Sequence, residues 1–148
     1  MPVDESGTFS EEIVVGPDAI DRNDHVNNVV YVQWMQDVAI AHARSTGGAQ
    51  ETDRLGATWV ARSHHIEYRR PALLGDRLIA KTWIAEVERV RSKRRYQFLK
   101  ADDQSVIAHG ETDWVYIDAN SGRPLAIPDS VRACFTVVAP KTANSSNA

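Results

Sequence analysis

Residues 28–44 read NVVYVQWMQDVAIAHAR, and apolar residues recur through this stretch at intervals of three and four, the period of one helix face. The positions that define this stripe are Val26, Val30, Trp34, Val38 and Ala41. Three further apolar side chains widen it around most of the circumference: Tyr31, Met35 and Ile40. Other structure should therefore cover much of this helix. The helix should end in Ser45-Thr46-Gly47-Gly48, because glycine readily adopts a left-handed cap.

Short stretches of β-type sequence lie on both sides of the helix. One strand is expected before it, and four are expected after it: Phe9–Val15, then Thr58–Arg69, Arg77–Val90, Ser92–Ala101 and Ser105–Asp118. Residues 47–56 are predicted as a loop, and Ile127 to Phe135 as a short helical turn. Because short turns join the four later strands, they should form an antiparallel meander. One face of that sheet needs a cover, and the chain offers one helix. The pattern predicts an α+β fold in which a curved sheet wraps around one long central helix.

The bulk properties of the chain narrow its class. Its 148 residues fit one domain, expected over residues 1–138, with residues 139–148 as a disordered tail. Hydrophobic residues make up 43% and charged residues 25%, as in ordinary globular proteins. The net charge of -3 argues against binding to a nucleic-acid backbone. The single cysteine, Cys134, allows no disulfide within the chain, and no spacing of His or Cys indicates a metal site. We find no membrane-spanning stretch and no signal peptide, so the cytoplasm is the expected location, and no cofactor is expected.

The start of the long helix carries the residues with chemical capability. Residues 21–31 read DRNDHVNNVVY. The N-terminus of a helix presents unpaired N–H groups, which bind anions and stabilise oxyanions. A carboxylate just upstream, Asp21, would face a carbonyl held on those donors. A thiol with a pKa of about 8.5 leaves readily, so a thioester can be hydrolysed without a strong general acid. Asp and Asn before an apolar helix are also ordinary capping residues, and this alternative stays open.

The run Asp21-x-Asn23-x-His25-Val26-Asn27-Asn28-x-x-Tyr31-x-x-Trp34 resembles the signature of the hotdog acyl-thioesterases. The run is similar to the active-site motif of the plant-type acyl-carrier-protein thioesterases, which reads Asp-x-Asn-x-His-Val-Asn-Asn. It also resembles the bacterial 4-hydroxybenzoyl-CoA thioesterase-like family. Residues 67–70 and 112–118 also resemble segments of these thioesterases, so the resemblance covers most of the chain. It implies a single hotdog domain that hydrolyses an acyl-CoA or acyl-carrier-protein thioester.

Position by position, the resemblance implies that Asp21 is the catalytic carboxylate and that Asn23 and His25 are polar active-site residues. The backbone N–H of Asn28 matches the donor to the thioester carbonyl. Asp24 departs from the pattern, because the bacterial family commonly has Gly there. Pro71 departs too, because the plant-type enzymes have a further catalytic Glu at this place. The second departure favours a scheme with one aspartate, which either attacks the carbonyl or activates water. The chain is too short for the two hotdog repeats of the plant enzymes, so a homodimer or homotetramer is expected.

A second group of residues is predicted to bind substrate. Arg89, Arg91, Lys93, Arg94 and Arg95 cluster at a predicted strand turn, where they would bind the phosphates of CoA at a surface rim or simply form a solvated hairpin tip. The substrate-binding set that we infer is Tyr31, Arg69, Arg91, Lys93 and Arg94. His64 and His65 should point to opposite faces of their strand, and Glu67 should point outward.

Two rival functions stay open at this stage. A hotdog hydratase is one, although the chain lacks the His followed by Gly-x-Pro of that group. A non-catalytic protein that binds an acyl thioester or another ligand is the other. The residues do not reveal the length of the acyl chain, or whether CoA or a carrier protein bears it.

Overall fold

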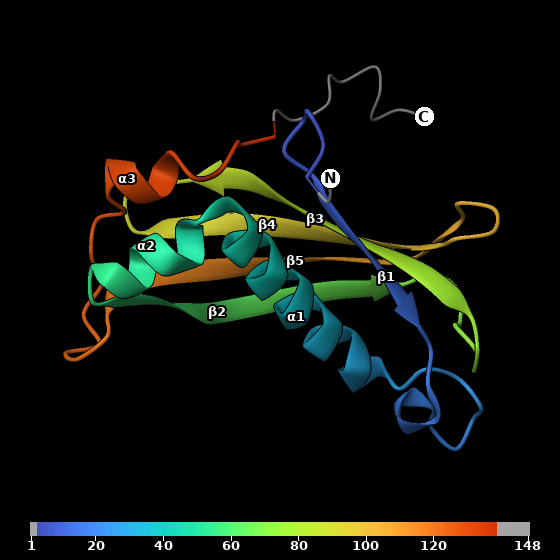
Figure 1. Ribbon diagram of the computed structural model, residues 1–148. Coiled ribbons are helices and arrows are strands. Elements are labelled where there is room, and N and C mark those ends of the chain that lie inside the picture. The colour runs from blue at the N-terminus through green and yellow to red at the C-terminus, as the bar shows by residue number, and fades with distance from the viewer. Residues whose placement is uncertain (1–2, 139–148) are drawn as a thin grey trace.

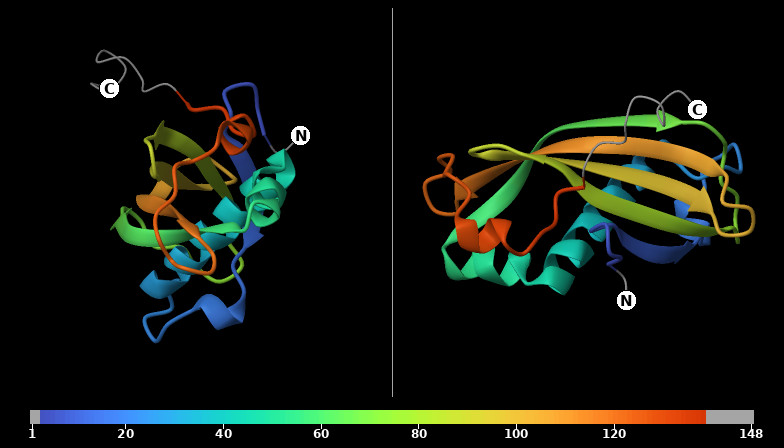
Figure 2. Two further views of the ribbon diagram at one scale, coloured as in Figure 1. Left: turned by 90° about the vertical axis from the view of Figure 1, so that its left-hand side faces the viewer. Right: turned by 90° about the horizontal axis from the view of Figure 1, so that it is seen from above.

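The computed structural model of the chain describes residues 3–138. They form one five-stranded antiparallel sheet, and the helices pack on one of its faces (Figures 1 and 2). This arrangement confirms the predicted α+β architecture with one long helix against a sheet. The predicted tail, residues 139–148, lies outside the described residues. In chain order the elements are β1 (Phe9–Val14), the 3-10 helix η1 (Pro17–Ala19), α1 (Asn28–Thr46), α2 (Gly48–Arg54), β2 (Ala57–Tyr68), β3 (Arg77–Val87), β4 (Arg91–Lys100), β5 (Val106–Asp118) and α3 (Asp129–Arg132).

The order of the strands differs from the predicted meander. Strands β3, β4 and β5 follow one another as expected, but β2 pairs with β5 rather than with β3. The full order is β1-β3-β4-β5-β2, so β1 and β2 form the two edges. The connection between β2 and β3, residues 69–76, is long enough for this crossing. Eight extended residues reach about 26 Å, whereas three strand spacings amount to only about 14 Å.

The crossing segment is also tied to the loop that precedes α1. Ala72 is fully buried, and its carbonyl accepts a hydrogen bond from the N–H of Val26 (2.9 Å). The N–H of Val15 donates to the carbonyl of Asp76 (2.9 Å), and the N–H of Gly75 donates to the carbonyl of Val15 (2.9 Å). Residues far apart in the sequence thus fix the position of the chain just before the long helix.

The segment between α1 and β2 is helical, so the predicted loop over residues 47–56 is wrong for most of its length. The predicted end of α1 is confirmed: Gly47 has a φ of 88° and its N–H donates to the carbonyl of Arg44. Helix α2 begins at the next residue. A Cβ on Gly48 would lie 2.5 Å from ring atoms of Phe135. Gly48 therefore allows close packing against the C-terminal segment. It does not end helix α1.

Helix α1 lies against the inner face of the sheet along one line of side chains. The buried line runs through Tyr31, Met35, Val38 and His42. It is displaced from the predicted centre of the apolar stripe. Elsewhere on the helix surface, Val29 is 72% exposed and Ile40 is 44% exposed. The single chain thus covers the helix on one side only, and the prediction that the helix is covered around most of its circumference does not hold for one subunit.

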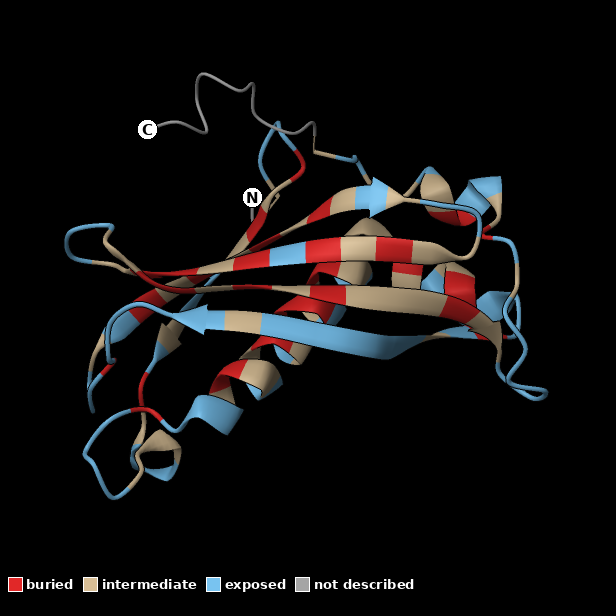
Figure 3. Cartoon of the chain, turned by 180° about the vertical axis from the view of Figure 1, so that it is seen from behind, coloured by how far each residue is buried: buried red, intermediate tan, exposed pale blue. Residues whose placement is uncertain are grey.

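Along the central strands, side chains point alternately to a buried face and to a more exposed face of the sheet. On β4 the residues that point toward the helices are Ser92, Arg94, Tyr96 and Phe98, all of them buried. Strand β2 is different, because most of its residues are exposed along its whole length (Figure 3). A long exposed edge strand offers unpaired backbone groups to another chain.

Gly110 on β5 lets α1 approach the sheet closely. A Cβ at this position would lie 2.8 Å from the carbonyl oxygen of His65 and 3.3 Å from two atoms of Met35. Replacing Gly110 with Ala is expected to lower the free energy of unfolding by about 1–3 kcal/mol, because backbone must shift to admit the methyl group. Urea unfolding measures the change. Gly16→Ala is the matched control, since nothing lies within 4 Å of its added Cβ. Equal stability of the two variants would contradict this account of the helix–sheet contact.

Candidate active site at the start of helix α1

Asp21 holds a tight loop that leads into α1. Its Oδ1 atom accepts hydrogen bonds from the N–H groups of Asn23 (2.8 Å) and His25 (3.3 Å). Its own N–H donates to the carbonyl of His25 (2.8 Å), and Ile20 pairs with Val26 across the loop. The Oδ2 atom makes no hydrogen bond within the part of the chain that the structure describes. One oxygen of the carboxylate therefore shapes the loop, and the other is available.

The first turn of α1 leaves one N–H group free. The side chain of Asn27 caps the helix by accepting from the N–H of Val29 (3.0 Å), and the N–H of Val30 donates to the carbonyl of Asn27. Among residues 3–138, no acceptor pairs with the N–H of Asn28. The hydroxyl of Tyr68 donates to the carbonyl of Asn28 (3.0 Å), which anchors this residue to β2. The helix start thus presents a fixed, unused donor.

Four residues were predicted as catalytic, and they lie together in residues 21–28. Asp21 is half-buried, whereas Asn23, His25 and Asn28 are exposed. The side chains of Asn23 and His25 make no hydrogen bond among the described residues. Asp24 has a φ of 63°, in the left-handed region that Gly, Asn and Asp adopt most easily. Asp24 therefore occupies a left-handed turn that Gly would also adopt without strain.

Tyr31, predicted to bind substrate, lies in an aromatic cluster below the loop. Its ring contacts the rings of Trp34, Tyr68 and Phe98 at centroid distances of 5.3, 5.3 and 5.4 Å. Burial raises the pKa of Tyr31 to about 12, so the hydroxyl stays neutral. The side chain lines neither the cavity between the sheet and the helices, described below, nor the hollow around Glu67 and Trp83. Its visible role is to support the first turn of the helix from beneath.

The basic residues around the turn between β3 and β4 do not form one surface cluster. Arg91 pairs with Glu88 at the turn (3.0 Å) and Lys93 lies 3.8 Å from Glu111 on the outer face of the sheet. Arg94 points to the inner face and is only 4% exposed, so it does not lie at a surface rim as predicted. The reason is the alternation of side chains along a strand. Arg91 and Lys93 remain at the outer face.

The histidines of β2 occupy opposite faces, as predicted. His64 points inward, and its Nδ1 atom lies 2.8 Å from the hydroxyl of Thr112. His65 points outward with Glu67, which lies 3.1 Å from His65 and 3.6 Å from His109. Hydrogen bonding from His65 and the charge of His109 lower the pKa of Glu67.

The predicted residue Arg69 belongs to this outer group. Its Nη2 atom lies 3.2 Å from Nε2 of His109. Arg69, Glu67 and the outward histidines therefore share the outer face of the sheet, away from the helices. In the part of the chain described, no group of three or more His, Cys, Asp or Glu side chains is arranged to hold a metal ion. No helix among residues 3–138 is long and apolar enough to cross a membrane.

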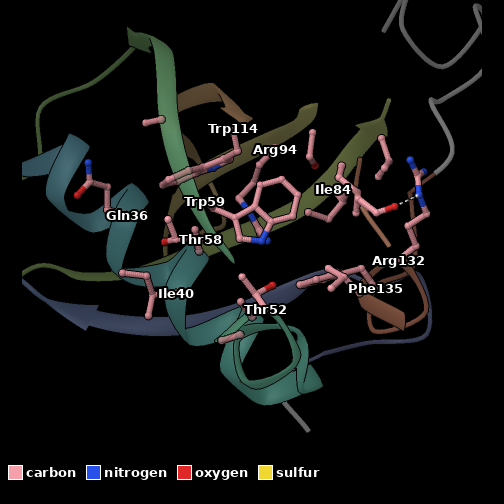
Figure 4. A pocket seen from close by; sticks show the side chains of 18 of the residues that line it. Gln36, Ile40, Thr52, Thr58, Trp59, Ile84, Arg94, Trp114, Arg132 and Phe135 are labelled. Atoms are coloured by element: carbon pink, nitrogen blue, oxygen red, sulfur yellow. Dashed lines mark hydrogen bonds between the residues drawn. The ribbon is translucent and has the colours of Figure 1, made fainter. Parts of the chain in front are cut away.

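A cavity of about 480 Å³ lies between the inner face of the sheet, the second half of α1, α2 and the C-terminal segment (Figure 4). Its wall is mainly apolar, with Ile84, Trp59, Trp114 and Phe135 among the larger side chains. None of the residues 21–28 lines it.

The sequence prediction missed this cavity and also the buried His42. The Nη1 atom of Arg94 lies 2.8 Å from Nδ1 of His42. Burial, together with the charge of Arg94, lowers the pKa of His42 to about 4. The presence of His42 among the apolar residues of α1 was the feature of the sequence that could have indicated a buried polar contact.

Comparison with solved structures shows the same fold in several thioesterases. A 1,4-dihydroxy-2-naphthoyl-CoA thioesterase from Synechocystis is 21% identical, with a TM-score of 0.78 over 86% of this chain and 95% of that one. An acyl-ACP thioesterase from Bacteroides thetaiotaomicron is 21% identical, with a TM-score of 0.82 over 93% of this chain and 56% of that one. A 12:0-ACP thioesterase from Umbellularia californica is 19% identical, with a TM-score of 0.76 over 85% of this chain and 48% of that one.

This chain thus spans about half the length of the two acyl-ACP enzymes and nearly the full length of the CoA enzyme. A search of curated protein sequences gave no match. The profile of the Thioesterase-like superfamily matches residues 15–135, which include the loop at Asp21, α1 and all strands but β1. The chain therefore has the hotdog fold and belongs to the thioesterase-like superfamily.

Proposed function

We propose that the protein hydrolyses an acyl thioester, carried by CoA or by an acyl-carrier protein, at the start of α1. Membership of the thioesterase-like superfamily supports the reaction class. The observation that carries the proposal is the free N–H of Asn28, which follows a loop held by Asp21. A thioester carbonyl that accepts from this N–H would have its negative charge stabilised as the carbon is attacked. Asn23 and His25, in the same loop, would contact the substrate beside this N–H.

In this scheme Asp21 acts through its free Oδ2 atom. Either that oxygen attacks the thioester carbon and forms a mixed anhydride, or it removes a proton from an attacking water. The thiolate then leaves, and water supplies the second oxygen of the acid in both routes. No cofactor is needed, because the leaving thiol has a pKa of about 8.5. A cytoplasmic enzyme with CoA or carrier-protein substrates fits this chemistry.

A homodimer or homotetramer would complete the site. The exposed edge strand β2, Ala57–Tyr68, is suited to pair with the same strand of a second copy. Its residue Tyr68 contacts Asn28, so such an interface would lie beside the start of α1. A two-fold axis along this edge would give two equivalent sites. The exposed Val29 and Ile40 side chains of α1 are also consistent with a covering partner.

The direct test is a panel of aliphatic and aromatic acyl-CoA substrates, with a thiol reagent to detect free CoA. We expect release of one thiol for each acid formed. Saturable binding without thiol release would instead support the non-catalytic binding protein. Hydration of an enoyl-CoA with the thioester intact would support the hotdog hydratase. Either of these two outcomes would overturn the proposed hydrolysis.

A further inference from the structure

A side chain from another element of the fold holds the carbonyl of Asn28. The hydroxyl of Tyr68, the last residue of β2, donates to this carbonyl (3.0 Å), and the two residues lie 40 positions apart in the sequence. The C-terminal end of β2 and the start of α1 lie at the same end of the molecule (Figure 1). Among residues 3–138, no other hydrogen bond joins β2 to α1. Tyr68 therefore links the edge strand to the residue that bears the free N–H.

The surroundings of the Tyr68 hydroxyl suit it to this contact. Partial burial raises the pKa of Tyr68 above its ordinary value, so the hydroxyl stays protonated and donates at neutral pH. The ring packs edge-on against the ring of Tyr31, with the centroids 5.3 Å apart, and this packing fixes the direction of the hydroxyl. A carbonyl oxygen has two lone pairs, so the carbonyl of Asn28 accepts from Tyr68 without competing with the hydrogen bonding of the helix.

The peptide unit between Asn27 and Asn28, which carries the free N–H, is tethered on both sides. On one side the N–H of Asn27 donates to the carbonyl of Ala19 (2.8 Å). On the other side Tyr68 holds the carbonyl of Asn28. The carbonyl of Asn27 accepts from the N–H of Val30 within the first turn (2.9 Å). Ala19 and Val30 act through their backbone, so the contact of Tyr68 is the one that a side-chain substitution can remove.

Such a tether matters because the free N–H stands at the end of a helix. Helix ends fray, and Asn28 is exposed. A donor that stabilises an oxyanion contributes most when it is fixed before the reaction, within about 0.5 Å of its working position. Loss of the Tyr68 hydroxyl would leave this N–H in the helix but free to point in a wider range of directions.

We propose that Tyr68 is a positioning residue for thioester hydrolysis, which directs the N–H of Asn28 at the substrate carbonyl through its bond to the carbonyl of Asn28. This inference rests on the proposed function. Tyr68 does not touch the reacting atoms; it holds the residue that does. Negative charge on the substrate oxygen develops only as the carbon is attacked, so the benefit falls on the reaction step rather than on substrate binding.

Tyr68→Phe tests this role, because it removes the hydroxyl and keeps the ring. With the best acyl-CoA of the panel, kcat should fall about 10-fold while KM stays within about twofold, since loosening a donor costs less than removing it. Tyr116→Phe is the matched control. It makes the same change on β5, where the hydroxyl is buried and makes no hydrogen bond among the described residues. Its kcat should stay within about twofold of the unaltered protein.

Two further measurements separate positioning from a structural role. A variant with 4-aminophenylalanine at position 68 keeps an N–H donor at the same place on the ring, so it should restore most of the lost kcat. A ketone analogue of the substrate, with a methylene group in place of the thioester sulfur, should still bind to Tyr68→Phe. The downfield shift that it causes in the amide proton of Asn28 should be smaller than in the unaltered protein.

The outcomes distinguish the role of Tyr68 from the proposed function. Absence of thiol release from the unaltered protein would overturn the hydrolysis, and the role of Tyr68 with it. Hydrolysis by the unaltered protein, with equal kcat for Tyr68→Phe and Tyr116→Phe, would overturn the role of Tyr68 alone. A Tyr68→Phe variant that fails to fold, or whose kcat the 4-aminophenylalanine variant does not restore, would also overturn positioning by the hydroxyl.

Discussion

Replacing Asp21 with Asn is expected to lower kcat/KM for thioester hydrolysis by about 100-fold or more, the usual contribution of a general base or nucleophile. The amide oxygen of Asn still accepts the N–H groups of Asn23 and His25, so the loop should keep its shape. Unfolding by urea should therefore show little change in stability. Thiol release from the best acyl-CoA of the panel measures the activity.

Asp24→Asn is the matched control for that substitution. It makes the same chemical change three residues away in the same loop, and Asn also adopts the positive φ found there. Its activity should stay within about twofold of the unaltered protein, as for most exposed substitutions. An Asp21→Asn variant as active as Asp24→Asn would contradict the catalytic role of the Asp21 carboxylate.

The stability of the protein should fall steeply as the pH drops below the ordinary pKa of histidine. The pKa of His42 is about 4 in the folded chain, against an ordinary value of 6.5. Between these values the unfolded chain binds the additional proton, so the free energy of unfolding rises with pH and falls as pH is lowered. From pH 7.5 to about pH 4.5 the expected loss from this group is about 2.5 kcal/mol. Urea unfolding across this range measures it.

His42→Gln is the comparison that isolates this effect. Glutamine keeps an acceptor for Arg94 and does not titrate. The variant should lack the part of the pH dependence that His42 supplies, while the carboxylates continue to respond equally in both proteins. If the two proteins lost stability in parallel between pH 7.5 and pH 5, His42 would not be the buried neutral group inferred from its contacts with Arg94 and Phe9.

The ends of α1 were predictable because local residues determine them. Asn27 and Gly47 are the residue types that cap helices, and both occupy cap positions. The partners of each strand were not predictable in the same way. Periodicity identifies β2 as a strand, but its neighbour depends on the path of residues 69–76, which a buried Ala72 and hydrogen bonds to distant residues fix. The position of β2 at an edge therefore emerges only from the fold.

The inward position of Arg94 was available from the sequence. Tyr96 and Phe98 stand two apart on a predicted strand, so their side chains share one face, and Arg94 precedes Tyr96 by the same interval. Because of that alternation, the basic residues of this strand point to two faces and cannot form one cluster. The acceptor from α1, His42, was not available, because it depends on how the helix lies across the sheet.

The candidate active site likewise has features that the local sequence predicts and features that depend on the fold. The motif identified Asp21 and the start of α1, and the local pattern allowed either capping or catalysis. The structure assigns the helix cap to Asn27 and one oxygen of Asp21 to the loop. Which N–H group stays free depends on this particular set of hydrogen bonds. The resemblance had named the N–H of Asn28 as the donor to the substrate, and the folded chain adds that this N–H has no partner among residues 3–138.

The most direct measurement is the amide resonance of Asn28 in a 15N–1H spectrum during titration with a ketone analogue of the substrate, in which a methylene group replaces the thioester sulfur. The analogue keeps the carbonyl and cannot be cleaved. A carbonyl bound by this N–H should move the proton resonance of Asn28 downfield, saturably, and together with resonances of the Asp21 loop. A saturable response in other residues, with Asn28 and the loop unchanged, would contradict the proposed site.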